Sequence, residues 1–545
     1  MGFNTKSVNV HQFAMIPRAD IPRASFNIQT THKTTFDAAY LIPVFCEEIL
    51  PGDTMRVNMT AYARLSTPIF PIMDNMYLDS FFFFVPNRLV WNHWQNFMGE
   101  QINPGDSTAY TIPQIVSPTG GFAVGSIYDY FGLPTVGQVG GGHTININAL
   151  PFRAYNLIWR EWFRDQNLQT SPATNQNSDG PDTYTDYVLK KRGKRHDYFT
   201  SALPWPQKGA TGVSIPLGTT APVKTSVSAT VIGSQAPLQM LVASGGGIPT
   251  ASLVYGNNAS GQVYEGTTAT GALQGTGLYP SNLYADLSAA TSATINQLRQ
   301  SFQIQKLLER DARGGTRYIE IIRAHFGVMS PDARLQRPEY LGGGSSPINI
   351  SPIAQTSASN LTGGSTPLGN LAAIGTAVAS RHGFSQSFVE HGYVIGLVMI
   401  RADLNYQQGI RKMWSRQTRY DFYFPAFAML GEQAVLNREI YADGSAADSN
   451  VFGYQERWAE YRYSPSKITG LFRSTSAGTL DAWHLAQRFA SLPTLNATFI
   501  EETPPVSRVL AVNTTNAQFL FDSFFDIKAT RPMPLYSVPG LIDHF

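Results

Sequence analysis

The stretch YLDSFFFFVPNRLVW, residues 77 to 91, places four consecutive phenylalanines in one strand-like run. Side chains alternate between the two faces of a strand, so Phe82 and Phe84 share one face while Phe81 and Phe83 share the other. Exposing a face would forgo about 1.5 to 3 kcal/mol of burial free energy for each large side chain. We therefore expect a sheet strand with one face on a sandwich core and the other covered by an inserted loop or a neighbouring subunit.

A second stretch, DTMRVNMTAYARLS at residues 53 to 66, alternates strictly between two kinds of side chain. Apolar Met55 and Val57 fall on one face and polar Arg56 and Asn58 on the other, the pattern of a half-buried antiparallel strand. Clusters of Gly, Pro, Asn and Ser separate the strand-like runs, which favours a β-sandwich over alternating βαβ units. Further strands are predicted at residues 316–328, 392–400 and 517–529.

Three helices are expected to interrupt the strands. Residues 150–166 and 294–315 place apolar side chains at helical spacing, and a shorter helical piece is expected at 89–99. Pro151 stands near the start of the first helix, where proline is tolerated. Each is interpreted as an ordinary packing helix.

The composition of the 545 residues indicates a covered surface. Hydrophobic residues make up 43% and aromatic residues 12%, against only 14% charged, so the chain can bury a large core but has little charge for its exterior. We expect neighbouring molecules to cover much of that exterior. The net charge of +2 is too small for a polycation that binds nucleic acid over its whole surface, so any such contact must be local.

Two segments are almost free of charge. Residues 209–290 carry only Lys224, Glu265 and Asp286, and short β-like runs within them favour an ordered, projecting insertion over a disordered linker. Residues 342–380 have no charged side chain, and we expect a neutral loop pressed against a neighbouring subunit. The predicted parts of the chain are therefore 1–208, the insertion at 209–290, and a remainder at 291–545 that ends in a C-terminal arm.

A basic cluster occurs in TDYVLKKRGKRHDYF, residues 185 to 199. Cations that can meet phosphates stand beside aromatic rings that can stack bases, which is the chemistry of sequence-tolerant single-strand binding. A solvated loop that only adds solubility explains the cluster equally well. The candidates for DNA contact are Lys190, Lys191, Arg192, Lys194, Arg195, Tyr198 and Phe199.

A second, sparser basic patch lies in GIRKMWSRQTRYDF, residues 409 to 422. Salt bridging at an interface is the favoured interpretation of this patch, ahead of DNA contact. Its candidate residues are Arg411, Lys412, Trp414, Arg416 and Arg419.

The usual local motifs of catalysis are missing from the sequence. It contains no Walker-type or dinucleotide-binding glycine loop, no H-E-x-x-H zinc motif and no G-x-S-x-G nucleophile motif. Histidines such as His382 and His391 lack the spacing that would place two metal ligands on one helix face. The sequence contains no run of eighteen consecutive apolar residues, the length needed for a helix that crosses a membrane. We therefore expect no enzyme activity, cofactor, metal site or membrane insertion.

Long stretches spread over the chain carry a family likeness. They are MDNMYLDSFFFFVPNRLVWNHWQNFMGE, RAYNLIWREWFRDQNLQ, QIQKLLERDARGGTRYIEIIRAHFGV, DARLQRPEYLGGGS, FVEHGYVIGLVMIRADLNYQQGIRKMWSR and RPMPLYSVPGLIDHF. All of them resemble the major capsid protein family of microviruses (Microviridae), specifically its gokushovirus branch. The resemblance runs nearly end to end and weakens only at residues 209–290.

The resemblance implies a single jelly roll of eight antiparallel strands with long inserted loops and a few helices. It also implies sixty copies in a T=1 icosahedral shell around circular single-stranded DNA. An enlarged loop, matched here by residues 209–290, would cluster at each threefold axis and contribute to host attachment. The implied partners are other copies of the chain, the DNA genome, an internal scaffolding protein, a DNA pilot protein and a host-cell receptor. The protein would assemble in the cytoplasm of a bacterial host and reside in the virion.

Two other classes of protein stay open on the residues alone. A jelly-roll carbohydrate-binding protein or glycosidase would need paired carboxylates about 5 to 9 Å apart in an aromatic-lined cleft. A nonviral single-stranded-DNA-binding protein would show strongly salt-dependent affinity without forming closed particles.

Overall fold

The structure is a computed structural model in which residues 22–208, 295–315, 318–327, 336–356, 369–511 and 517–536 are described. Shorter described stretches are 223–225, 240–242, 253–255, 263–265, 278–280, 283–285, 359–361, 364–366 and residue 515. The chain divides into two compact units. One comprises Met1–Pro206 and Gly314–Phe545, and the other comprises Gln207–Arg313.

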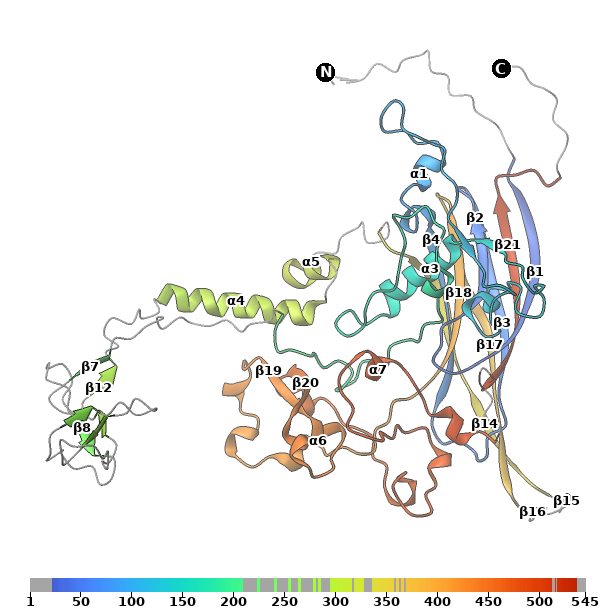
Figure 1. Cartoon of the computed structure of the whole chain (residues 1–545). Coiled ribbons are helices and arrows are strands. Elements are labelled where there is room, and N and C mark those ends of the chain that lie inside the picture. Colours follow the sequence, from blue (N-terminus) through green and yellow to red (C-terminus); the bar gives the residue numbers. More distant parts are fainter. Residues whose placement is uncertain are drawn as a thin grey trace, which may run out of the picture. The chain divides into compact units, whose positions relative to one another are not determined.

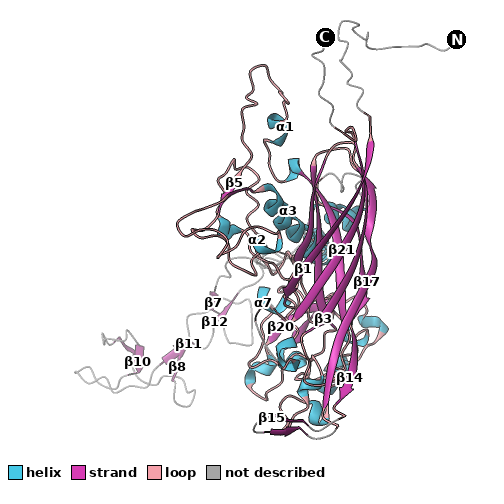
Figure 2. Cartoon of the chain, turned by 90° about the vertical axis from the view of Figure 1, so that its right-hand side faces the viewer, coloured by secondary structure: helices cyan, strands magenta, loops and turns pink. Residues whose placement is uncertain are grey.

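Two antiparallel sheets form the centre of the larger unit (Figure 1). The first sheet has the order β1 (Ala24–Phe36), β21 (Phe519–Arg531), β3 (Thr54–Leu65), β17 (Leu371–Ser387) and β14 (Asn349–Ala354). The second has the order β13 (Glu339–Pro347), β4 (Met76–Pro86), β18 (Gly392–Ala402) and β2 (Ile42–Ile49). Figure 2 shows the long strands of the first sheet running side by side.

Successive strands of the chain switch between the two sheets. β1, β3, β14, β17 and β21 belong to the first sheet, and β2, β4, β13 and β18 to the second, so among these strands only the steps from β4 to β13 and from β14 to β17 stay within one sheet. This alternation is the arrangement of a double-sheet jelly roll. The predicted mainly β fold with few helices is confirmed, and in the described part β14 pairs with β17 at one edge of the first sheet.

The core between the sheets follows the alternation seen in the sequence. In β3, Met55, Val57 and Met59 are buried while Arg56 is exposed. The strands predicted at 392–400 and 517–529 are β18 and β21. β21 alternates in the same way as β3, whereas every residue of β18 is buried, which shows that the second sheet is covered on both faces.

Strand β4 is covered on both faces, as its four phenylalanines predict. Phe82 and Phe84 belong to the core between the sheets. Phe83 belongs to a second core on the outer face, where its ring centroid lies 5.5 Å from that of Trp162, and Phe81 packs against the same core. The cover is the chain's own insertion between β4 and β13, so an inserted loop, not a neighbouring subunit, buries this face.

Helix α3 (Leu150–Ile158) supplies much of that cover and continues as a π-helical turn, η2 (Trp159–Phe163). Figure 1 shows α3 beside β4 and β18, and all of its residues after Pro151 are buried. The helix predicted at 150–166 is thereby confirmed. The same insertion contains α1 (Trp94–Phe97), within the short helical piece predicted at 89–99, together with α2 (Ile127–Tyr130), β5 (Gln114–Val116) and β6 (Asn146–Asn148).

One predicted strand is a helix. Most of residues 316–328 form α5 (Tyr318–Phe326) instead. The isoleucines of this stretch have high β propensity, but its apolar residues Ile319, Ile322 and Phe326 recur three and four positions apart. The helical spacing of the apolar residues outweighs the β propensity of the isoleucines, because the spacing determines which side chains can be buried together.

The neutral loop predicted at 342–380 is wrong where this segment is described, because β13, β14 and β17 occupy most of it, with a short pair β15 (Ser359–Leu361) and β16 (Gly364–Thr366). Its glycines serve close packing. A Cβ on Gly342 would lie 2.4 Å from the carbonyl oxygen of Gly383, and one on Gly344 would lie 2.6 Å from Cδ2 of His382. Glycine is therefore needed in β13 so that β17 can approach it.

The connection between β18 and β21 forms a third packed region of the larger unit. It contains the paired strands β19 (Glu432–Leu436) and β20 (Val451–Glu456) and the short helices α6 (Asn437–Ile440) and α7 (Ala497–Ile500). Its hydrophobic core includes Val435, Phe452 and Phe499 and receives Tyr198 and Phe199 from the insertion after β4. Two insertions far apart in the sequence therefore share one core.

The smaller unit contains three nested antiparallel strand pairs. These are β7 (Val223–Thr225) with β12 (Leu283–Ala285), β8 (Met240–Val242) with β11 (Leu278–Pro280), and β9 (Leu253–Tyr255) with β10 (Val263–Glu265). Helix α4 (Ile295–Gly314) corresponds to the helix predicted at 294–315. Most of residues 209–290 lie outside the described residues, and the role of this segment as a projecting insertion stays a prediction.

Candidate functional site

The basic segment at residues 190–195 is a connector inside the larger unit. On one side, Lys190 and Arg192 exchange main-chain hydrogen bonds with residues 39–41. On the other side, Arg192 and Lys194 exchange main-chain hydrogen bonds with residues 500–502. The segment therefore joins the beginning of the jelly roll to the insertion before β21, and it is not a solvated loop.

Arg192 reaches down to the second sheet. One of its terminal nitrogens lies 3.2 Å from the carboxylate of Asp79 on β4, and its guanidinium group lies 5.4 Å from the ring centre of Phe81. The same Asp79 oxygen accepts a hydrogen bond of 2.7 Å from Nε of Arg401 on β18. One buried carboxylate thus holds two guanidinium groups, one from the insertion and one from the sheet.

Lys194 is buried, with 6% of its surface exposed. Its ammonium group donates a hydrogen bond of 3.1 Å to Gln487 and lies 4.2 Å from the ring centre of Phe499. Burial lowers the pKa of Lys194 to about 8, because removal from water disfavours the charged form. The nearby carboxyl of Glu502 is also buried, and burial raises its pKa to about 7.

The remaining candidates of the first cluster differ in exposure. Lys190 and Lys191 are half-buried, with their ammonium groups 5.3 Å and 5.2 Å from the ring centres of Trp159 and Tyr40, at cation–π distance. Arg195 is exposed. DNA contact by this cluster stays a prediction, and Arg195 is its most accessible cation.

The two aromatic candidates of the cluster, Tyr198 and Phe199, are buried in the core around Val435. The Tyr198 hydroxyl donates a hydrogen bond of 2.9 Å to Glu439. Base stacking needs an open ring face, so these two rings would have to leave the core before they could stack on a base.

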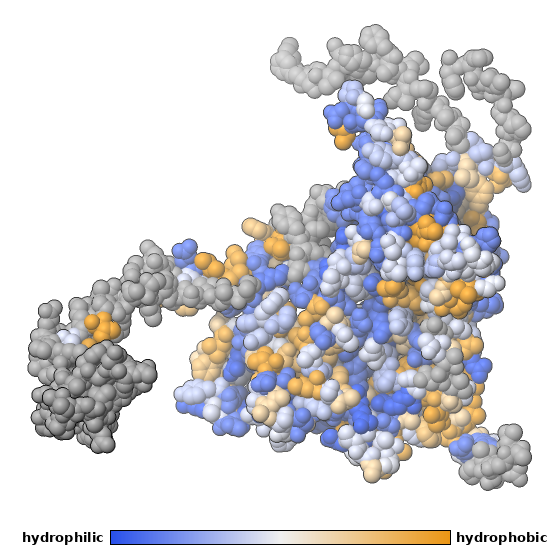
Figure 3. Space-filling model, in the orientation of Figure 1, coloured by the Kyte–Doolittle hydropathy of each residue, from blue (hydrophilic) through white to orange (hydrophobic). Residues whose placement is uncertain are grey.

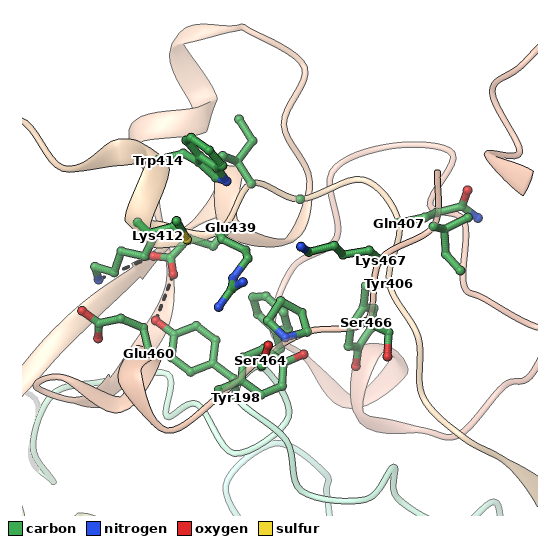
Figure 4. A pocket seen from close by; sticks show the side chains of 18 of the residues that line it. Tyr198, Tyr406, Gln407, Lys412, Trp414, Glu439, Glu460, Ser464, Ser466 and Lys467 are labelled. Atoms are coloured by element: carbon green, nitrogen blue, oxygen red, sulfur yellow. Dashed lines mark hydrogen bonds and ion pairs between the residues drawn. The ribbon is translucent and has the colours of Figure 1, made fainter. Parts of the chain in front are cut away.

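The second basic patch lines a pocket of about 670 Å³ (Figure 4). Arg411, Lys412, Trp414 and Arg416 all contribute to its wall. Arg419 is not among the lining residues, and its guanidinium group lies 5.3 Å from the ring centre of Phe424.

Two carboxylates in the pocket wall already have partners. Glu439 accepts the hydrogen bond from Tyr198 and lies 3.6 Å from the ammonium group of Lys412. Glu460 lies 3.2 Å from a terminal nitrogen of Arg416. The ion pairs predicted for this patch therefore form within the chain for Lys412 and Arg416, and interface salt bridging by the other cations stays a prediction.

Sequence reasoning missed the opposite wall of the pocket. Lys467 and Arg473 also line it, as do the rings of Tyr461 and Tyr463. These two cations stand apart from each other in SPSKITGLFRSTS, residues 464–476, without a basic run or a motif around them. Only the fold brings them opposite Arg411.

Across the residues that the structure describes, no group of three or more His, Cys, Asp and Glu side chains could hold a metal ion. In the same residues, every helix is too short or too polar to cross a membrane.

Comparison with known proteins decides the family. A family model described as "Capsid protein (F protein)" matches residues 14–541. The chain belongs to this capsid protein family.

Three relatives named "Capsid protein VP1" match the chain over nearly its whole length. The relative from Bdellovibrio phage phiMH2K is 51% identical over 98% of this chain and 99% of its own. Those from Chlamydia phage 1 and Spiroplasma virus 4 are 43% and 39% identical, with at least 98% of both chains covered. The predicted microvirus family is confirmed, and the protein is a structural component of phage virions, not an enzyme.

Membership in the capsid family also settles how the paired carboxylates of the pocket are interpreted. Glu439 and Glu460 stand among aromatic rings, as the glycosidase alternative requires, but each is held by a cation of the same chain. A general acid and a nucleophile need carboxylates that can reach a substrate. The capsid protein uses these two groups to fix its own loops.

The capsid protein exposes a run of large apolar side chains at residues 420–430, here called the aromatic loop. Tyr420 is 69% exposed and Met429 is 96% exposed. The other exposed members are Phe422, Tyr423, Phe424 and Leu430. Figure 3 shows hydrophobic surface over the region of β19 and β20, to which the loop connects. The composition predicted a surface that needs covering, and the aromatic loop is such a surface.

Proposed function

We propose that this capsid protein assembles as sixty copies into a closed T=1 icosahedral shell around circular single-stranded DNA. Membership in the capsid family supports self-assembly. The observation that carries the proposal is the aromatic loop, because contiguous apolar surface on a soluble protein marks an interaction site. Aromatic residues and methionine are also enriched at the centres of protein interfaces.

In this proposal the aromatic loop binds a second copy of the chain. The loop is fixed from behind, since the guanidinium group of Arg416 lies 5.4 Å from the ring centre of Phe422 and the indole nitrogen of Trp458 donates a hydrogen bond of 3.0 Å to the carbonyl of Phe427. A pre-ordered apolar surface loses little entropy on binding. Repetition of one such contact by symmetry closes a shell.

The proposed enclosure of DNA requires other cations. Each copy carries a net charge of only +2, so a shell cannot neutralise a genome of thousands of phosphates by itself. Counterions, polyamines or a basic packaged component supply the remainder. The family resemblance adds an internal scaffolding protein and a DNA pilot protein as partners, and it assigns residues 209–290 to a threefold protrusion that meets a host-cell receptor.

Electron microscopy of the full chain, expressed alone and with the scaffolding protein of the same virus, tests the proposal. The wild-type chain should form closed particles of one size. A Tyr420→Ser, Met429→Asp double variant should stay folded, as measured by circular dichroism, but should remain as small species in sedimentation. Ile102→Asp serves as the control, since Ile102 is an 81% exposed apolar residue outside the loop.

Either of two results would contradict the proposal. Wild-type protein that stays monomeric under every condition, with strongly salt-dependent DNA affinity, would favour a nonviral single-strand-binding protein instead. Closed particles formed by the double variant as readily as by the wild type would show that the aromatic loop is not a contact between copies.

A further inference from the structure

The pocket between the second basic patch and residues 460–473 has the size of a ligand site. Its volume of about 670 Å³ lies within the range of roughly 300 to 1,000 Å³ that is usual for small-molecule sites. Figure 4 shows Trp414 and Lys467 on different segments around this pocket. Both walls belong to the connection between β18 and β21, and Tyr198 and Phe199 from the insertion after β4 also line the pocket.

Three cations of this pocket have no partner in the described part of the chain. The side chains of Arg411, Lys467 and Arg473 form no hydrogen bond and no ion pair there, in contrast to Lys412 and Arg416. Like charges that face one cavity repel each other, and the two carboxylates of the wall are already used. An anionic ligand would remove this repulsion.

Trp414 offers the second element of a binding site. It is 74% exposed, and among the described residues no ring or cation packs against its indole. Most other tryptophans of the described chain do pack against rings, as Trp91 and Trp162 illustrate. A free indole beside free cations can stack on the face of a nucleic-acid base.

The chemistry of the free groups selects among ligands. Carbohydrate hydroxyls need acceptors as well as donors, and the acceptors Glu439 and Glu460 are occupied. The wall also carries the hydroxyls of Ser464, Ser466 and Thr469, but its charged groups without a partner in the described chain are all cations, and Trp414 adds an exposed flat ring. The cations and the ring match a phosphate joined to an aromatic base, which is the repeating unit of single-stranded nucleic acid.

We propose that this pocket binds a segment of single-stranded DNA, with phosphates at Arg411, Lys467 and Arg473 and a base stacked on Trp414. The inference deepens the proposed function, on which it rests for the source of the strand. Binding itself is a property of the isolated chain, so it can be measured whether or not a shell forms.

The test uses the full-length chain and a fluorescently labelled oligothymidylate of about ten nucleotides, with binding followed by fluorescence anisotropy. The triple variant Arg411→Gln, Lys467→Gln, Arg473→Gln should bind the oligothymidylate more weakly. The slope of log K plotted against log salt concentration should also become less steep, by about 0.7 for each phosphate contact that is lost. A control variant with the same loss of charge is Arg56→Gln, Arg64→Gln, Lys528→Gln, on the exposed face of the first sheet. The control should bind as the wild type does.

The stacking contact has its own test. Trp414→Ala should weaken binding of the oligothymidylate by about tenfold, and it should leave binding of an abasic strand of the same length unchanged. Electron microscopy of the same variant reports shell formation separately. Intact shells with reduced DNA binding would support the pocket, and loss of shells with unchanged DNA binding would place Trp414 at a contact between copies.

Three results would overturn the inference. One is equal loss of binding in the pocket variant and in the control with matched charge, which would reduce the effect to net charge. Another is wild-type affinity in the pocket variant, which would place the strand elsewhere. The third is binding of a single thymidine nucleotide as tightly as the oligothymidylate, which would make the ligand a free nucleotide and not a strand.

Discussion

The carboxylate of Asp79 on β4 accepts a hydrogen bond of 2.7 Å from Nε of Arg401 on β18, in a place where only 3% of the arginine is exposed. Arg192 of the insertion completes the group. Asp79 therefore links β18 to β4 through Arg401 and fastens the covering insertion to the second sheet through Arg192.

Removal of Asp79 should destabilise the protein strongly. Asp79→Ala removes the hydrogen-bonded carboxylate from buried Arg401 and leaves it only the more distant Asp403, 3.7 Å from Nη1, so the free energy of unfolding should fall by about 3 to 5 kcal/mol. Asp522→Ala breaks the exposed pair with Lys33 and should cost less than about 1 kcal/mol. Urea denaturation of the two variants measures both values. Equal losses would mean that Arg401 finds another partner or water.

The two faces of β4 should matter about equally. Phe82→Ala opens a cavity between the sheets, and Phe83→Ala opens one under the insertion, each at a cost of about 3 to 5 kcal/mol in unfolding free energy. Phe524→Ala, on the exposed face of β21, should cost much less. Thermal or urea unfolding provides the comparison. A mild Phe83→Ala variant would show that the insertion is only loosely attached to the sheet.

The carboxyl of Glu502 should make stability depend on pH. Its pKa is raised to about 7 in the folded protein, against about 4.3 for an unperturbed glutamate. Between these values the folded state binds more protons than the unfolded state, so the free energy of unfolding falls as the pH rises. Between about pH 5 and pH 8, the free energy of unfolding of the Glu502→Gln variant should therefore fall by about 1 to 3 kcal/mol less than that of the wild type.

Urea titrations at several pH values check the prediction for Glu502. Glu100→Gln, at an exposed position, is the control and should keep the wild-type profile. Parallel profiles of the wild type and the Glu502→Gln variant would contradict the prediction. Measurements stay below about pH 8, because the lowered pKa of buried Lys194 adds an opposite slope above that value.

The basic segment should separate into structural and accessible cations. Arg192→Gln removes a partner of Asp79 and should lower the free energy of unfolding by about 1 to 3 kcal/mol. Arg195→Gln, at an exposed position, should change it by less than about 0.5 kcal/mol. If the segment contacts the genome, Arg195→Gln should reduce nuclease-protected DNA per particle without loss of shells. Unchanged DNA content would remove Arg195 from the DNA surface.

Close packing around His382 should forbid a side chain at Gly344. Ser80 and Ser346 hold the imidazole from both sides, at 2.8 Å and 3.1 Å, so the ring cannot move away from a new Cβ. Gly344→Ala should cost about 1 to 3 kcal/mol in unfolding free energy. Gly141→Ala, which meets no atom within 4 Å, should be nearly neutral. A neutral Gly344→Ala variant would show that β13 and β17 can separate.

Local periodicity accounts for the parts of the fold that were predicted correctly. The alternation in β3 and β4 and the helical spacing in α3 each involve neighbours in the sequence, so the pattern itself indicates which faces are buried. The errors arose where two local tendencies conflict. Residues 316–328 contain branched residues with high β propensity but form α5, and the charge-free segment at 342–380 was predicted to be a loop although its glycines allow β13 to pack closely against β17.

The sequence by itself determined the family, the β-sandwich and the burial of both faces of the strand that carries the four phenylalanines. The tertiary structure decided what covers that strand, which cations form ion pairs or hydrogen bonds within the chain, and which have no such partner among the described residues. Arg192 and Lys194 looked like surface charges, but Arg192 is half-buried against Asp79 and Lys194 is buried beside Gln487, each partner more than 100 residues away. Lys467 and Arg473 carried no pattern and became part of a pocket. The physical reason is that periodicity is a property of adjacent residues, while desolvation and charge pairing depend on which distant segments the fold brings together.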